Sequence, residues 1–247
     1  MRLKFICCDV FARLAYSYAA VSDHIIDLEL VPMLRHNEPS ALRADLQERI
    51  NRCANDRRYD KIILGYGLCG NSISGLTAPL PLVIPRMHDC CAMFMGSREK
   101  FTDVFGKNLS MRWSSCGYHE RCHGMGRSDC CDGSEADSNY KTSLEYLRLA
   151  EEYGEDNAEY VWQTLNPPIE THEAVYIKID GFEYGSCEED FKRDVENGGK
   201  GLINAKGSSD WFKRLVNGPW DAENFLTVPP GSKVHPVYDL QEVIKSV

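Results

Sequence analysis

Short apolar runs separated by helical patterns are the feature that most constrains the fold of this chain. Runs at residues 3–8, 25–31, 61–64, 82–84, 175–179 and 225–228 predict strands, and the first of them is closed by Asp9. Helices are expected at residues 11–22, from Ser40 as N-cap, from the His88–Cys91 segment to Phe105, from Asp137, and at 156–165, 187–195 and 211–216. Strands that alternate with helices need crossover connections. We therefore predict an α/β fold: an open, mainly parallel, Rossmann-like sheet with helices on both faces.

The length of 247 residues suits one large domain, and we expect residues 1–247 to form a single α/β domain. Residues 110–134 are polar, rich in Gly and Cys, and show no hydrophobic periodicity, so they are expected to be a long loop inserted in that domain. The second half of the chain is expected to complete the same sheet.

Composition excludes several classes of protein. Hydrophobic residues make up 43% of the chain, which excludes a disordered protein, and the net charge of −9 disfavours a nucleic-acid partner. There is no apolar run of 18 residues, so no membrane span is expected. The first eight residues do not resemble a signal peptide, which predicts a cytoplasmic protein whose thiols stay reduced.

The chain has 11 cysteines and seven histidines. An odd number of cysteines argues against a complete disulfide framework, so the cysteines are expected either to bind a metal or cluster or to fill the core as small apolar residues. Cys7, Cys53 and Cys187 are expected to be packing or surface residues, and the acidic neighbours of Cys187 predict an inert thiol with a raised pKa.

Reactive side chains recur where predicted strands end. Cys8 closes the first strand, Cys69 follows the third, and His88 and Cys90 follow the fourth. The carboxyl ends of neighbouring parallel strands meet at one edge, where α/β proteins bind ligands. If these strands are neighbours, three thiolates and an imidazole make a zinc site, and three cysteines with one open position suit an iron–sulfur cluster. The alternative is that the cysteines fill core gaps while His88 caps a carbonyl.

A second candidate set lies within the expected loop. It consists of Cys116, His119, Cys122, His123, Cys130 and Cys131. A long loop without an apolar pattern is stabilised efficiently by a structural metal. The spacing is not that of a zinc finger or ribbon, so exposed thiols without a metal, or ligands to the same centre as Cys69 and Cys90, are alternatives.

The segment from Gly65 to Gly70 matches the glycine pattern of dinucleotide-binding loops and follows a predicted strand. On this interpretation Gly65, Gly67, Gly70 and Asn71 would contact a cofactor. Two other interpretations stay open: a tight turn that needs glycine for its backbone angles, and a turn that presents Cys69 as a ligand or thiol.

Several segments together resemble the DUF1638 family: residues 6–10, 63–71, 83–90, 153–158 and 225–231. The resemblance covers most of the chain. It implies a role in anaerobic one-carbon or corrinoid metabolism, beside corrinoid proteins and methyltransferases, without supplying a reaction. It favours Cys8, Cys69, His88 and Cys90. The Cys/His-rich segment from Cys116 to Cys131 departs from the family pattern and suggests a specialised variant.

Together these features predict a zinc- or iron–sulfur-binding protein, whose thiolate–metal centre assists methyl transfer and which meets a corrinoid only through a partner. One alternative is a non-catalytic metal-delivery or accessory partner of a corrinoid protein or methyltransferase. A weaker alternative is a nucleotide-binding enzyme that uses Gly65–Gly70.

Overall fold

The computed structural model describes residues 1–33, 39–56, 58–106, 108, 111–123, 144–165, 172–237 and 242–247. The elements of the first half are β1 (Arg2–Cys8), η1 (Asp9–Phe11), α1 (Ala12–Ala20), β2 (Ile25–Val31), α2 (Pro39–Arg52), η3 (Cys53–Asn55), β3 (Lys61–Gly65), β4 (Leu82–Pro85), α3 (Cys90–Met95) and α4 (Arg98–Phe105). Those of the second half are β5 (Arg112–Ser115), α5 (Cys116–His123), α6 (Leu144–Tyr153), α7 (Glu155–Leu165), β6 (Glu173–Lys178), α8 (Cys187–Asn197), β7 (Gly201–Lys206), α9 (Asp210–Asn217), β8 (Phe225–Val228), β9 (Val234–Pro236) and β10 (Ile244–Ser246).

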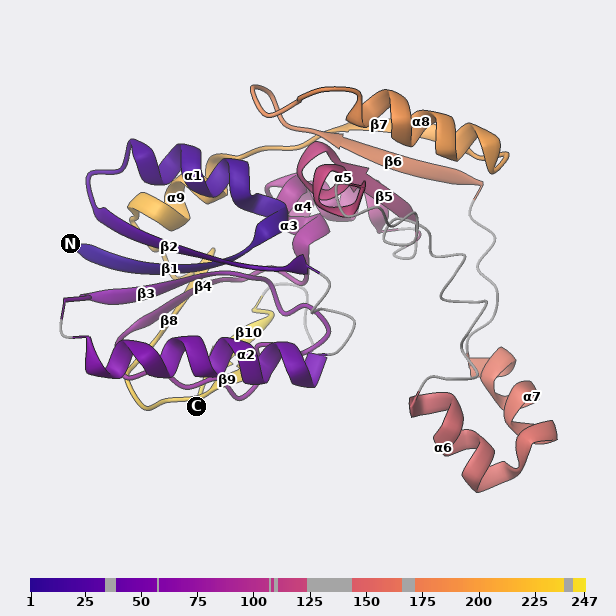
Figure 1. Ribbon diagram of the computed structural model, residues 1–247, viewed down its shortest axis with the longest axis horizontal. Helices are drawn as coiled ribbons and strands as arrows, with labels where there is room; N and C mark the ends of the chain where they lie inside the picture. Colours follow the sequence, from indigo (N-terminus) through magenta and orange to yellow (C-terminus); the bar gives the residue numbers. More distant parts are fainter. Residues whose placement is uncertain are drawn as a thin grey trace.

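A five-stranded, mainly parallel sheet forms the centre of the fold, in the order β2-β1-β3-β4-β8. The first four strands are parallel, and β8 pairs antiparallel with β4. Helices α1 and α9 cover one face and α2 covers the other (Figure 1). The predicted α/β class is therefore confirmed, as is the condition that the first, third and fourth strands are neighbours.

Helix α2 shows how the sequence directs the packing. Leu42, Leu46 and Ile50 recur every four residues and are all buried, which confirms the predicted apolar face. The predicted N-cap at Ser40 is wrong, because the helix already includes Pro39. Proline suits a first helical position, where its missing N–H group has no helical partner to lose.

The single helix expected up to Phe105 is two helices. Gly96 ends α3 with a φ of 87°, and the Ser97 side chain accepts a hydrogen bond from Lys100 N to begin α4. A side chain at Gly96 would place its Cβ 2.6 Å from Cβ of Ser208. Close packing against the loop before α9 thus accounts for the break.

The second half of the chain was expected to complete the central sheet, but it does not. Of the described strands in this half, β8 alone joins it, while β5, β6 and β7 form a separate three-stranded parallel sheet. The expectation of a loop was wrong for residues 112–123, which form β5 and α5. Trp113 pairs with Val175 in that sheet. This long-range pairing stabilises β5 as a strand, although the local sequence has no strand-like periodicity. The rest of the predicted insertion, residues 124–134, lies outside the described residues.

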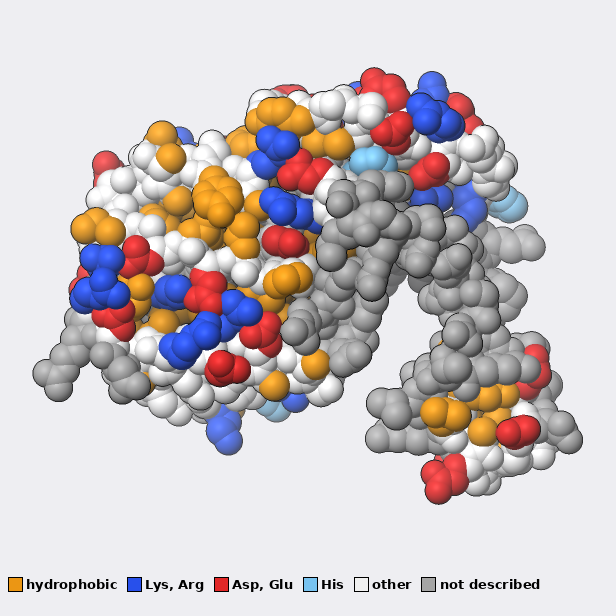
Figure 2. All heavy atoms as spheres, in the orientation of Figure 1, with side chains coloured by type: hydrophobic (Ala, Val, Ile, Leu, Met, Phe, Trp, Pro, Cys, Tyr) orange, Lys and Arg blue, Asp and Glu red, His pale blue; other side chains and the backbone are white. Residues whose placement is uncertain are grey.

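Ion pairs cover the edge strand β2. The Glu29 carboxylate lies 2.6 Å from Lys4 Nζ, 2.5 Å from Arg49 Nη1 and 2.6 Å from Arg52 Nη2. Charged side chains on an edge strand discourage pairing with another chain. Figure 2 shows acidic and basic side chains interspersed on the face that it presents. Among the described residues, no helix is long and apolar enough to cross a membrane.

One hydrophobic cluster joins the two larger sheets, since Val175 and Ile177 of β6 belong to the same buried cluster as β1, β3 and β4. Aromatic rings form its centre. The ring of Phe212 on α9 lies 5.7 Å from that of Phe5, 5.6 Å from that of Phe11 and 4.7 Å from that of Trp211.

We expect Phe212→Ala to lower the free energy of unfolding by about 3–5 kcal/mol, because it leaves a cavity among these rings. Urea unfolding followed by circular dichroism measures the change. Tyr16→Ala on α1, where the side chain is 60% exposed, is the matched control and should stay within about 0.5 kcal/mol of the wild type. Equal losses in the two variants would contradict the assigned core.

Candidate functional site

Three thiols meet at the carboxyl edge of the central sheet. Cys8 is the last residue of β1, Cys69 lies in the turn after β3, and Cys90 begins α3 after β4. Because β1, β3 and β4 are parallel neighbours, their ends face the same side. β2 lies on one side of β1, and β3 and β4 lie on the other, so the order of connections reverses at β1. Open α/β sheets bind ligands at the carboxyl edge beside such a reversal.

The loops after β3 and β4 are paired to each other. Leu68 N donates to Met87 O at 2.9 Å, and Cys69 N donates to His88 O at 2.8 Å. Between the strand and these bonds lies Gly67, where an added Cβ would be 2.8 Å from Met87 O. The glycine therefore lets the two loops approach closely enough to bring Cys69 to Cys90.

The other features of the glycine-rich turn also have structural explanations. An added Cβ at Gly65 would lie 2.5 Å from Sγ of Cys7, so this glycine makes room for a core cysteine. Cys69, Gly70 and Asn71 all have a positive φ, of 44°, 62° and 67°. A left-handed cysteine is strained, and strain of this kind is concentrated at functional sites.

This geometry bears on the predicted cofactor contacts at Gly65, Gly67, Gly70 and Asn71. Residues 66–81, all of them described, contain no helix, so the turn has no helix N-terminus to hold a pyrophosphate. The N–H groups of Leu68 and Cys69 are already bonded to the neighbouring loop. These observations weigh against the phosphate cradle. The positive φ of Gly70 agrees with the tight-turn interpretation, and a turn that presents Cys69 stays a prediction.

Cys8 is buried and Cys69 and Cys90 are half-buried, and all three thiols hold their protons. Burial raises the pKa of Cys8 to about 12, although the N–H group of Val10 lowers it. Burial raises the pKa of Cys69, and Asp89 and Cys8 raise it further. Burial also raises the pKa of Cys90, followed in order by the effects of Cys69, Asp89 and Cys8. The effect of Cys8 on Cys69, and of both on Cys90, indicates that the three thiols are neighbours.

Tyr66 lies beside this cluster, and the sequence did not identify it as a site residue. Its side chain is 4% exposed, and its hydroxyl has no hydrogen-bond partner in the described chain. Burial raises the pKa of Tyr66, and Cys8, Cys7 and Cys69 raise it further. A tyrosine between Gly65 and Gly67 is the only local signal that the sequence offers, and it does not by itself indicate a site.

His88 and Asp89 connect β4 to α3. The carboxylate of Asp89 caps α3 by accepting a hydrogen bond from Ala92 N at 2.8 Å, and burial raises the pKa of Asp89. The neighbouring His88 lowers the pKa of that carboxyl group and so acts in the opposite direction. Nε2 of His88 is buried and has no hydrogen-bond partner in the described chain.

The second predicted set is only partly visible. Cys116 and His119 lie on α5, as do Cys122 and His123, whose side chains are not described; Cys130 and Cys131 lie outside the described residues. Sγ of Cys116 lies 3.0 Å from Sγ of Cys187, and Nε2 of His119 lies 3.9 Å from the Asp190 carboxylate.

Cys187, expected to be a packing or surface residue, is therefore the thiol partner of Cys116. The predicted direction of its pKa shift is confirmed, but the causes differ. Burial raises the pKa of Cys187 to about 12, and the hydrogen bond with Cys116 contributes next.

Over the described ranges, no three His, Cys, Asp or Glu side chains stand together closely enough to hold a metal ion in this arrangement. The structure therefore places Cys8, Cys69 and Cys90 in one cluster as protonated thiols rather than as a formed ligand set. In chemical terms the cluster offers three soft sulfur atoms, a tyrosine hydroxyl and a nearby imidazole.

Fold and site together define an α/β protein with a cluster of three thiols at the carboxyl edge of a mainly parallel sheet. Residues 30–215 match DUF1638, a family described as a protein of unknown function, so the chain belongs to the DUF1638 family. Comparison with curated proteins gave no match, and neither did comparison with solved structures.

We expect Gly67→Ala to destabilise the protein by about 1–3 kcal/mol, because the added methyl group would press on backbone atoms of the β4–α3 loop. Thermal unfolding measures the effect. Gly198→Ala is the control: its added Cβ would meet nothing closer than 3.5 Å. A stability of Gly67→Ala equal to that of the control would show that the loops are not tightly apposed.

Stability should also fall in alkaline solution. The thiol pKa is raised in the folded chain from 9.0 to about 12 at Cys8, so above pH 9 the unfolded chain releases protons that the folded chain keeps. The stabilisation is complete below pH 9 and is lost as the pH rises to about 12, with up to about 1.4 kcal/mol per pH unit for each group. Urea unfolding across this range, with chelator and reductant present, measures the slope, and Cys69→Ala should make it shallower. An unchanged slope would contradict the burial of these thiols.

Proposed function

We propose that this protein binds a thiophilic metal centre, either zinc or an iron–sulfur cluster, through Cys8, Cys69 and Cys90. The observation that carries the proposal is the position of Cys8, Cys69 and Cys90 beyond the carboxyl ends of three neighbouring parallel strands. Three cysteines leave one coordination position open, which is typical of a centre that also binds a substrate or a fourth protein ligand.

Metal binding would change this cluster in a defined way. A soft cation displaces thiol protons and draws the sulfurs inward, because thiolate is the ligand form of cysteine. The hydrogen bond from Cys69 N to His88 O already holds the backbones that carry Cys69 and Cys90 beside each other. The strained φ of Cys69 supports a functional role for its orientation.

Tyr66 and His88 have separate roles in this proposal. The Tyr66 hydroxyl, which faces Cys8, would donate a hydrogen bond to a metal-bound thiolate. Nε2 of His88, which has no hydrogen-bond partner in the described chain, is a nitrogen donor in the connection between β4 and α3. A thiolate–metal centre supplies Lewis-acid activation of a bound thiol or water. The corrinoid-linked methyl transfer and the accessory role that the family resemblance implies stay predictions beyond this proposal.

Cobalt titration of protein purified without oxygen tests the proposal. Wild-type protein should give intense thiolate-to-cobalt absorption in the near ultraviolet, competed by zinc, and Cys69→Ser and Cys90→Ser should weaken binding by at least about 100-fold. Reconstitution with iron and sulfide tests the cluster alternative, and the same variants should lose its visible absorption. Tyr66→Phe should weaken binding by about tenfold.

Cys53→Ser is the matched control, because Cys53 is a buried cysteine on η3 far from the strand ends and should leave the absorption unchanged. Circular dichroism shows whether each variant folds. If the combined variant Cys8→Ser, Cys69→Ser, Cys90→Ser folds and binds cobalt like the wild type, the ligands lie elsewhere and the proposal fails.

A further inference from the structure

A second pair of thiols lies outside the strand-end cluster, at the start of two helices. Cys116 is the first residue of α5 and Cys187 is the first residue of α8, and their sulfurs are 3.0 Å apart although the residues are separated by 71 positions. A disulfide bond is about 2.05 Å long, so an approach of about 1 Å would close one.

The backbone of Tyr184 holds both sulfurs in place. Its N–H group donates to Sγ of Cys116 at 3.3 Å, and its carbonyl oxygen accepts from Sγ of Cys187 at 3.1 Å. The Tyr184 ring lies under the Arg13 guanidinium, 4.0 Å from it, and Arg13 also pairs with Glu120 of α5 at 2.6 Å. Contacts from α1 and α5 therefore keep the loop before α8 against Cys116.

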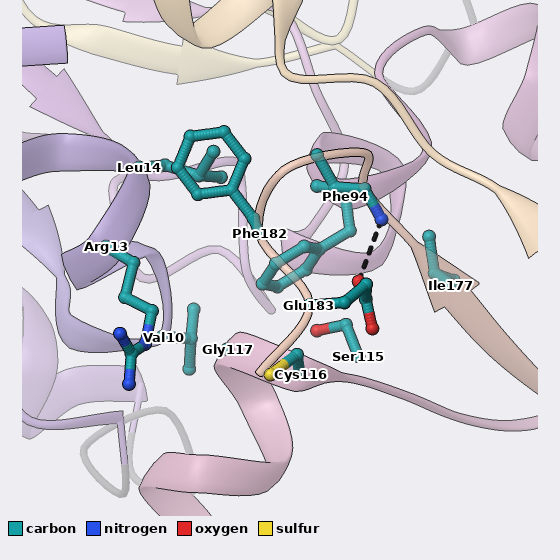
Figure 3. Close-up of a pocket in the computed structure, with 11 residues that line it drawn as sticks. Val10, Arg13, Leu14, Phe94, Ser115, Cys116, Gly117, Ile177, Phe182 and Glu183 are labelled. Atoms are coloured by element: carbon teal, nitrogen blue, oxygen red, sulfur yellow. Dashed lines mark hydrogen bonds between the residues drawn. The ribbon is translucent and has the colours of Figure 1, made fainter. Parts of the chain in front are cut away.

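The two thiols differ in access. Cys116 is 1% exposed and lines a narrow pocket beside Ser115 and Gly117, as Figure 3 shows. The free volume of this pocket, about 20 Å³, is enough for roughly one water molecule. Cys187 is half-buried and reaches solvent. A half-buried thiol beside a fully buried one suits an attacking and a resolving cysteine.

We propose that Cys116 and Cys187 form a reversible dithiol–disulfide pair that is oxidised by low-molecular-weight disulfides. Cys187 first loses its proton, and its sulfur then attacks the disulfide RSSR, forming a Cys187–SR bond and releasing one thiolate. Because the pKa of Cys187 is raised to about 12, this step is slow at neutral pH and faster in alkaline solution. The Cys116 sulfur then attacks Cys187, breaks that bond and releases the second thiolate. Two electrons and two protons pass from the cysteine pair to two RSH molecules.

Oxidation would tie β5–α5 to α8 covalently and close the chain between residues 116 and 187. Such a long closed segment restricts the unfolded chain strongly, so the oxidised protein should melt at least about 5 °C higher than the reduced protein. The pair is separate from Cys8, Cys69 and Cys90, so its failure and the failure of metal binding are independent results.

Oxidised glutathione is the probe, applied to reduced full-length protein with chelator present. After free thiols are blocked, peptide mapping should find Cys116 linked to Cys187, and dithiothreitol should reverse the link and the rise in melting temperature. Cys53→Ser should behave like the wild type. In Cys116→Ser, glutathione should stay attached to Cys187, whereas in Cys187→Ser the buried Cys116 should stay unmodified.

Each other result would overturn the proposal. Glutathione that persists on Cys187 of the wild type shows that Cys116 does not resolve it. A wild-type map in which both thiols stay free, or in which either is linked to another cysteine, shows that the pair is not redox-active. The wild-type map decides the question even if a variant does not fold.

Discussion

The pairing of the loops after β3 and β4 is the constraint on which the candidate site depends. Two backbone hydrogen bonds, Leu68 N to Met87 O and Cys69 N to His88 O, extend the parallel contact of the strands beyond their ends. Gly67 makes this contact possible, because a side chain there would strike the opposite backbone. Without this contact, Cys69 and Cys90 would be carried by independent loops, and the thiol cluster would have no fixed geometry.

The glycine-rich turn shows that one sequence pattern can meet two different structural requirements. Spaced glycines after a strand are typical of a loop that approaches a phosphate closely, and they also suit a loop that approaches another backbone. Here the approached groups belong to the chain itself: the Cys7 side chain at Gly65 and the β4–α3 loop at Gly67. The glycine pattern correctly predicted that another group approaches the turn closely. It did not identify that group, which only the tertiary structure shows.

The two thiol sites are built in different ways. Cys8, Cys69 and Cys90 meet because sheet topology gathers strand ends that are themselves recognisable in the sequence. Cys116 and Cys187 meet because β5 pairs with β6 and α5 packs on α8, contacts that join distant parts of the chain. The first group was therefore predictable once the strand order was assumed, whereas no local pattern connects the members of the second.

The sequence by itself determined the element types whose apolar periodicity is strong: the strands of the central sheet, the buried face of α2 formed by Leu42, Leu46 and Ile50, and the position of cysteines at strand ends. Only the tertiary structure decided that β5 and β7 are strands of a second sheet, that Gly96 divides α3 from α4, and that Cys187 faces Cys116. The two groups differ in the sequence separation of the residues that interact. Burial patterns are repeated every few residues along the chain, but a strand without such a pattern, or a thiol without a neighbouring partner, acquires its role from a segment far away in the sequence.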